Sequence, residues 1–216
     1  MPVVYLVRHG QASFGAADYD VLSDLGREQS EMVGATLGGR GLREPLAVAG
    51  TLRRQRETAT LALAAAGLDV EPGTDGRWDE YDHMGLLQRY PPPDPEHDGT
   101  SKGVQALLDV ALETWVRDGA AGGWTAFSDG AAGALADLCA ELGRGRDGLV
   151  FTSGGIIAAL CARLLSLPPA GVVAVNRESA NGALTKLVVG GSGTSLVSFN
   201  DHAHFEGATR GMLTYR

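Results

Sequence analysis

A histidine lies directly after a short apolar run near the start of the chain. Residues 3–7, VVYLV, predict a strand buried on both faces of a sheet, and Arg8, His9 and Gly10 follow it. Ligands of open α/β sheets bind beyond the carboxyl ends of strands, so these residues are expected at a binding crevice. An imidazole whose second ring nitrogen is held by a backbone carbonyl can attack a phosphoryl group, Arg8 could bind the phosphoryl oxygens, and Gly10 would allow the ligand to approach closely. Taken alone, the tripeptide is also compatible with side chains that merely end a strand.

A second group of cations is expected at the end of the next strand. Residues 46–49 form a short apolar run, and arginines follow at positions 53, 54 and 56. The N-terminus of a helix attracts anions and disfavours cations, so three arginines there indicate a bound anion. We expect Arg53 to pair with Glu57 one turn along the helix, which leaves Arg54 as the anion ligand.

Three segments resemble the histidine phosphatase superfamily, the phosphoglycerate mutase-like proteins: LVRHGQAS, LSDLGREQ and TLRRQRETA. The first is similar to the signature loop of that family. In the third, Arg54 stands four residues before a Thr-Ala pair, as a pocket arginine of the family does. The resemblance implies a phosphate pocket formed by Arg8, His9 and Arg54.

The resemblance extends to the segment WDEYDH at 78–83 and to SFNDHAHF near the C-terminus. The first of these resembles the part of the family that supplies an acidic residue, and we expect Glu80 to protonate the leaving alkoxide. General acid catalysis of this kind typically contributes roughly 10²–10⁴-fold to the rate. Asp79 and Asp82 are close enough in the sequence to be alternative donors. Four side chains are expected to contact the substrate: Gln11, Ser13, Tyr81 and His83.

One pocket residue departs from the pattern of the family. The family normally has Ser-His-Gly-Gly after a later strand, whereas this chain has Ser153 at the histidine position, followed by Gly154. A serine hydroxyl can donate one hydrogen bond to a phosphoryl oxygen but carries no charge, and the loss of one preorganised donor typically costs about 10²–10³ in rate. The Gly154 N–H, at the start of a helix, could still contact the anion. A pocket histidine could also come from elsewhere, as His83, His202 or His204.

These residues predict hydrolysis of a small phosphomonoester through a phosphohistidine at His9, with no cofactor and no metal. One alternative is phosphoryl transfer of the cofactor-dependent phosphoglycerate mutase type, which requires a site closed to water. Hydrolysis is favoured because the chain lacks the longer mutase-type pattern around its RHG loop. The other alternative is a phosphate-binding protein whose activity is impaired or lost because of Ser153.

The elements that must position these residues alternate between strand and helix. A helix is expected after the N-cap Ser23 up to the glycines at 38–41, and another from the arginine cluster to Gly67. The later elements are expected as a strand at 149–152, an apolar helix at 156–167, and a hairpin of two strands at 184–189 and 195–199. This order predicts an α/β fold with three α/β/α layers, a mostly parallel sheet and one late antiparallel strand.

The periodic pattern breaks between about residues 75 and 130. Four prolines lie between positions 91 and 95, and an amphipathic helix follows with apolar residues from Val104 to Trp115. We interpret this segment as a helical cap, inserted into a single domain over residues 1–216, that sets substrate specificity. A further helix is expected from Ala131 to Leu142.

Composition restricts the classes of partner. The net charge is −8, from 18 basic and 26 acidic residues, which opposes binding to nucleic acid. Cys139 and Cys161 lie in apolar helical stretches and are expected to be reduced. The N-terminal apolar run is too short for a signal peptide, and no stretch is long enough to span a membrane. We therefore expect a cytoplasmic protein that binds a small phosphorylated substrate and no membrane, and a homodimer is left open.

Overall fold

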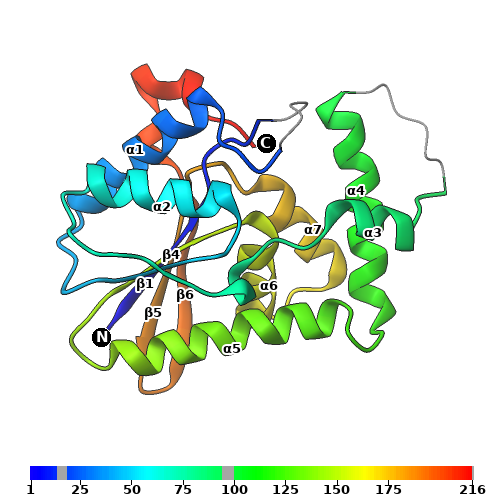
Figure 1. Ribbon diagram of the computed structural model, residues 1–216. Coiled ribbons are helices and arrows are strands. Elements are labelled where there is room, and N and C mark those ends of the chain that lie inside the picture. The colour runs from blue at the N-terminus through cyan, green and yellow to red at the C-terminus, as the bar shows by residue number, and fades with distance from the viewer. Residues whose placement is uncertain (14–18, 94–99, 216) are drawn as a thin grey trace.

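The computed structural model describes residues 1–13, 19–93 and 100–215 and contains a six-stranded sheet between helices (Figure 1). The strands are β1 Val3–Arg8, β2 Leu46–Ala49, β3 Gly73–Thr74, β4 Gly148–Thr152, β5 Leu184–Gly190 and β6 Gly193–Asp201. Their order in the sheet is β3-β2-β4-β1-β5-β6. The pairs β1–β4, β2–β4 and β2–β3 are parallel, whereas β5 is antiparallel to both of its neighbours. The expected α/β fold with one late antiparallel strand is confirmed.

The register of the central strands brings their carboxyl ends together. Arg8 of β1 lies opposite Thr152 of β4, and Ala49 of β2 lies opposite Phe151. The loops that leave these three strands therefore begin side by side at one edge of the sheet. They carry the residues at 8–10, 50–54 and 153–155, which come from three distant parts of the sequence.

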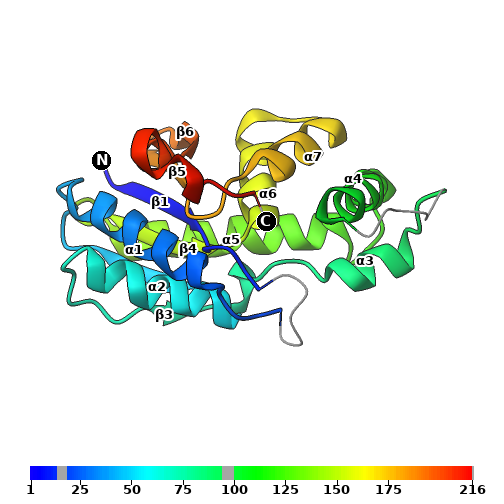
Figure 2. The same cartoon turned by 90° about the horizontal axis from the view of Figure 1, so that it is seen from above.

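Helices cover both faces of the sheet. On one face lie α1 (Asp24–Gly38) and α2 (Arg53–Ala65), whose apolar side chains pack with Tyr5 and Phe151. On the other face, α5 (Trp124–Leu142) and α6 (Gly154–Leu165) pack against Leu6. The expected three layers are therefore present, as Figure 2 shows from above. Burial of such side chains typically stabilises a fold by roughly 1.5–3 kcal/mol each.

The segment interpreted as a cap contains three helical elements, and the first of them contributes Trp78 to the core of the domain. They are the 3₁₀ turn η1 (Gly76–Trp78), α3 (His83–Arg89) and α4 (Ser101–Asp118). In Figures 1 and 2, α3 and α4 lie together at one end of the molecule, away from α1 and α2. The cap helix α4 packs on α7 (Pro169–Glu178), a helix that the sequence pattern did not indicate.

The helix expected from Ala131 begins earlier, at Trp124. Its first two turns carry Trp124 and Phe127, whose rings lie 5.3 Å and 5.5 Å from the ring of Trp115 on α4. Because these aromatic contacts hold the start of α5, the glycine at 130 does not break the helix. Part of the segment interpreted as cap therefore belongs to a helix that continues under the sheet.

The apolar helix α6 begins two residues earlier and ends earlier than the expected span 156–167. Its first eight residues are all buried, which explains its apolar sequence. Ser166 ends it in a left-handed conformation, with φ 54°. In the part of the chain that the structure describes, no helix is both long enough and apolar enough to cross a membrane.

Candidate active site

His9 lies at the end of β1 with only 4% of its surface exposed. Its Nδ1 lies 2.7 Å from the carbonyl oxygen of Gly10, and its Nε2 lies 3.2 Å from Nε of Arg54. Since Nδ1 can only donate to a carbonyl, Nε2 is the unprotonated nitrogen and accepts from Arg54. Burial, followed by the charges of Arg54 and Arg8, holds the pKa of His9 well below its usual range. The imidazole is therefore neutral at neutral pH, and Nε2 is its unprotonated nitrogen.

Arg54 is held by a carboxylate that the sequence analysis did not identify. Its NH1 lies 2.7 Å from Asp20 Oδ1, and Asp20 Oδ2 accepts from the backbone N–H of Arg53 at 2.8 Å. Asp20 thus supplies a negative charge at the start of α2, where the arginine cluster indicated a bound anion. The unfavourable position of three arginines at the N-terminus of this helix is therefore partly offset by Asp20, a residue of the same chain. Asp20 lies in the loop after β1, and no spacing or periodicity in the sequence marks it.

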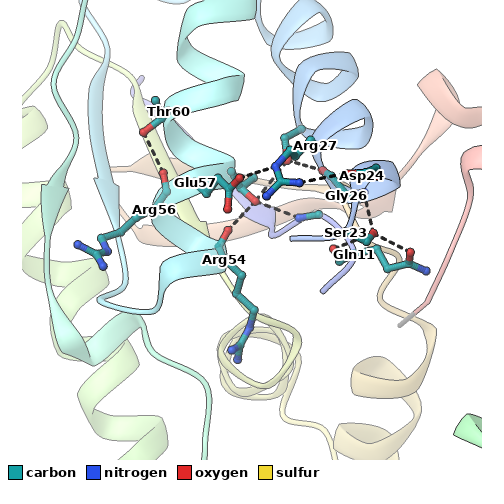
Figure 3. Close-up of polar contacts among 12 residues, drawn as sticks. Gln11, Ser23, Asp24, Gly26, Arg27, Arg54, Arg56, Glu57 and Thr60 are labelled. Atoms are coloured by element: carbon teal, nitrogen blue, oxygen red, sulfur yellow. Dashed lines mark hydrogen bonds and ion pairs between the residues drawn. The ribbon is translucent and has the colours of Figure 1, made fainter. Parts of the chain in front are cut away.

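The expected ion pair between Arg53 and Glu57 is replaced by a contact between helices. Glu57 Oε1 accepts from Arg27 Nε at 2.7 Å, and Arg27 also reaches Asp24 at 3.1 Å. Figure 3 shows Arg27 of α1 pointing toward Glu57, while the side chains of Arg54 and Arg56 point in different directions. Glu57 therefore ties α2 to α1, because close packing of the two helices brings Arg27 within reach.

Arg8 is held by two segments from late in the chain. Its NH1 donates to the carbonyl oxygen of Ser179, just after α7, and to that of Tyr215 at 3.1 Å. The guanidinium also lies beside the start of α6, since a Cβ added at Gly154 would lie 3.6 Å from Arg8 Nε. These contacts fix the direction of a long flexible side chain at the end of β1.

Gly10 has a structural role beside the expected one. A Cβ at this position would lie 2.1 Å from the carbonyl oxygen of Gly26 in α1. The backbone N–H of Gly10 donates to Thr58 Oγ1 at 3.1 Å. The glycine is therefore required by the close packing of α1 against the loop after β1, and its expected role in the approach of a ligand stays a prediction.

The three candidate carboxylates in the segment after β3 have separate partners. Glu80 accepts from the backbone N–H groups of Gly155 and Tyr81, each at 3.1 Å. Asp79 accepts from the backbone N–H and the hydroxyl of Thr51, both at 2.5 Å. Asp82 caps α3 through two of its backbone N–H groups. Glu80 is the carboxylate that lies against the start of α6, where a Cβ at Gly155 would be 2.1 Å from Oε1.

Ser153 is not placed at the surface of the site. It is fully buried, and its Oγ accepts from Gln55 Nε2 at 2.8 Å. The same amide donates to the carbonyl oxygen of Trp78 at 3.0 Å. The hydroxyl proton of Ser153 is not used in this bond, so the hydrogen bond expected from Ser153 to a phosphoryl oxygen stays a prediction. Gln55, on the buried side of α2, was not identified from the sequence, since nothing in the pattern links it to Ser153.

A cavity of about 560 Å³ brings together residues from the ends of the strands and from the cap. Seven of the residues that the sequence analysis singled out line it: Arg8, His9, Arg54, Glu80, Tyr81, His83 and Gly154. The alternative donor Asp82 lines it as well. The ring of His83 lies 4.5 Å from that of Tyr81, and burial lowers the pKa of His83. Four polar lining residues had no signal in the sequence: Tyr19, Gln105, Asn176 and Tyr215.

The remaining candidates lie outside this cavity. Gln11 Oε1 accepts from the hydroxyl of Ser23 at 2.9 Å, because the N-cap of α1 lies beside the loop. The backbone of Ser13 is bonded to Val21 at 2.8 Å. His202 and His204 bond to the carbonyl oxygens of Asn200 and Gly182. Of the three histidines considered as substitutes for the missing one, His83 alone lines the cavity.

A mostly parallel sheet with a histidine and two arginines at its carboxyl edge is an arrangement suited to phosphoryl transfer. Residues 4–202 match the model of the histidine phosphatase superfamily (branch 1), and the chain belongs to this family. The resemblance seen in the sequence is therefore confirmed. A comparison with curated protein sequences finds no match.

Solved structures share the fold over nearly the whole chain. A mycobacterial glucosyl-3-phosphoglycerate phosphatase is 23% identical with a TM-score of 0.65, covering 93% of this chain and 100% of the other. A phosphoglycerate mutase from Bacillus anthracis is 18% identical with a TM-score of 0.65, and 94% of each chain is covered. A functionally characterised open reading frame of Mycobacterium tuberculosis is 22% identical with a TM-score of 0.64, covering 93% of this chain and 97% of that one. The family supports a general phosphoryl-transfer function, and these neighbours show that the fold is shared.

Proposed function

We propose that this protein is a histidine acid phosphatase-like enzyme that hydrolyses a small phosphomonoester through a phosphohistidine at His9. The observation that carries the proposal is the contact of 3.2 Å between Arg54 Nε and His9 Nε2, in a cavity that Arg8 and Glu80 also line. The neutral imidazole directs its nucleophilic nitrogen toward a guanidinium group suited to phosphoryl oxygens. The proposed reaction needs no metal ion and no cofactor.

In the first step, His9 Nε2 forms a bond to phosphorus and the bond from phosphorus to the ester oxygen breaks. Arg8 and Arg54 neutralise the charge on the phosphoryl oxygens, and the Gly154 N–H at the start of α6 adds a donor. The Glu80 carboxyl gives its proton to the departing alkoxide. In the second step, water attacks the phosphohistidine and loses its proton to the Glu80 carboxylate, which releases inorganic phosphate and restores His9.

Hydrolysis is supported over mutase-type transfer by the access of water to the cavity. Among the residues that line it, Met84 is 66% exposed and Tyr19 is 44% exposed. A phosphohistidine in a site open to solvent is short-lived, whereas retention of the phosphoryl group requires exclusion of water.

The closed environment of Ser153 favours one further outcome, a protein that binds phosphate without turnover. Release of phosphate from an aryl phosphate by purified protein distinguishes an active phosphatase from a protein that only binds phosphate.

Replacement of Glu80 by glutamine tests the assignment of the proton donor. We expect kcat/KM for an alkyl phosphate to fall by roughly 10²-fold, because an alkoxide leaves only when it is protonated. The value of kcat/KM reports the steps up to loss of the leaving group and not the later hydrolysis that Glu80 also assists. For 4-nitrophenyl phosphate it should fall much less, since that leaving group is stable as an anion. Asp82→Asn is the matched control, because Asp82 lines the cavity but caps α3. Equal losses with both substrates in the Glu80 variant, or a dependence on the leaving group in the Asp82 variant, would contradict the assignment.

A restored histidine at position 153 tests whether its absence limits the rate. An imidazole there needs the space that the Gln55 amide occupies, so the substitution is best made together with Gln55→Ala. We expect the double variant Ser153→His, Gln55→Ala to turn over substrate at least several-fold faster than Gln55→Ala alone, because a donor is added to the pocket. Steady-state kinetics of both variants measure the effect. A rate that is unchanged or lower would show that the pocket is organised around serine.

A further inference from the structure

The cavity has two chemically different walls. The edge of the sheet contributes the charged and polar groups of Arg8, His9, Arg54 and Glu80. The cap contributes mainly apolar side chains from α3 and α4, and these are Met84, Leu87, Val104 and Leu108. The two cap helices lie beside the layers in Figures 1 and 2, so a phosphoryl group bound at the edge of the sheet would extend its organic part toward them.

Among the cap side chains that the structure describes, none that lines the cavity offers a counter-charge for a second anionic group. Among the described residues that line the cavity, Arg8 and Arg54 are the cationic ones, and both belong to the proposed phosphate site. His83 faces the cavity from the cap, but burial lowers its pKa and favours the neutral ring. Arg177 of α7 is bound by Asp109 of α4, with 2.7 Å between Nε and Oδ2, and it does not line the cavity.

The charged lining residues outside the proposed phosphate site are acidic. Asp82 contributes a carboxylate from the start of α3, and Glu80 lies between the cap and the start of α6. A carboxylate or a second phosphate on the substrate would lose water beside these groups without gaining a cation. An apolar group would bury the half-exposed side chains of α3 and α4, which is favourable by about 25 cal/mol per Å².

We infer that the substrate carries its phosphoryl group on an apolar, uncharged organic group that packs against α3 and α4. This inference rests on the proposed function and adds the substrate class. A cavity of about 560 Å³ accommodates such a group beside the phosphoryl group. Phosphomonoesters with a carboxylate near the phosphate, such as phosphoglycerates or phosphoserine, are excluded from this class.

Two non-hydrolysable ligands of equal length test the inference by calorimetry on the intact protein. Butylphosphonate and 3-carboxypropylphosphonate differ by one methyl group exchanged for a carboxylate. We expect the dissociation constant of butylphosphonate to be at least about tenfold lower, because its methyl end is buried on the cap wall. Inorganic phosphate serves as the probe of the proposed phosphate site alone.

A cation placed on the cap wall should reverse this preference. In Leu108→Arg we expect 3-carboxypropylphosphonate to bind at least about tenfold more tightly than in the wild type, and butylphosphonate to bind more weakly. Val110→Arg is the matched control, because Val110 lies on the same helix, is 43% exposed and does not line the cavity. Its ratio of the two dissociation constants should equal that of the wild type. If Leu108→Arg does not fold, the ratio of the two dissociation constants in the wild type still tests the inference about the substrate.

The outcomes separate this inference from the proposed function. Equal binding of the two phosphonates, a preference for the carboxylate, or binding of phosphate with neither phosphonate would overturn the substrate class and leave the phosphate site intact. Absence of binding by all three ligands would remove the phosphate site, and the proposed function with it.

Discussion

His9→Ala is expected to lower the turnover of an aryl phosphate by at least roughly 10³-fold, because it removes the atom that forms the bond to phosphorus. The loss should be seen in kcat, since Arg8 and Arg54 remain to bind the phosphoryl group. Rapid quenching of the wild type with substrate should trap phosphate on the protein in an acid-labile linkage, and the variant should trap none. His202→Ala is the matched control, because His202 lies outside the cavity and bonds to a backbone carbonyl.

The pH dependence of wild-type activity is a second test of the role of His9. The pKa of His9 is held well below its usual value of 6.5, so the ring stays neutral and nucleophilic below that pH. The acidic limb of kcat/KM, which reports the free enzyme, should therefore lie below pH 6.5 for a substrate whose phosphate does not titrate in that range. A limb at or above pH 6.5, or full activity in His9→Ala, would exclude His9 as the nucleophile.

Arg54→Ala is expected to lower kcat/KM by roughly 10²–10³-fold, because one preorganised cation leaves the site where charge develops. Arg54→Lys should recover little of this loss. A single ammonium group cannot replace the planar fork, which contacts His9 Nε2 through Nε and Asp20 through NH1. Kinetics of both variants, with circular dichroism to confirm folding, measure the effect.

Arg56→Ala is the matched control for Arg54. Both residues lie in the first turns of α2, but Arg56 is exposed and its side chain points away from that of Arg54 in Figure 3. Its kinetics should be close to those of the wild type. Similar losses in the Arg54 and Arg56 variants would mean that the positive charge of α2 as a whole acts on the substrate, rather than a specific contact.

Local patterns predicted much of the fold, because the features involved are contiguous in sequence. The apolar runs that form β1, β2 and β4 and the N-cap Ser23 mark their elements directly. The parallel order of the strands then implied that Arg8, His9 and Arg54 meet at one edge. The helix α7 was missed because it is short and begins with two prolines, Pro168 as its N-cap and Pro169 as its first residue, which are more typical of a loop.

The partners within the site could not be predicted, because they join residues far apart in the chain. Asp20 reaches Arg54, and Gln55 reaches Ser153, across distances in sequence that leave no periodic signal. The expected pair of Arg53 and Glu57 failed for the same reason, since the helical spacing was correct but a residue of α1 competed for the carboxylate. Helix positions were thus easier to predict than the choice of hydrogen-bond partner.

The hydrogen bond from Arg8 to the carbonyl oxygen of Tyr215 has a consequence for biosynthesis. A ribosome makes β1 long before it reaches Tyr215, so the guanidinium of Arg8 gains this anchor only after the segment around residue 215 has left the exit tunnel. Nascent chains should therefore acquire affinity for phosphate late and abruptly, after most of the sheet has formed. A series of chains tethered to the ribosome by linkers of increasing length, challenged with protease in the presence and absence of phosphate, would show protection by the ligand only when residue 215 lies outside the tunnel.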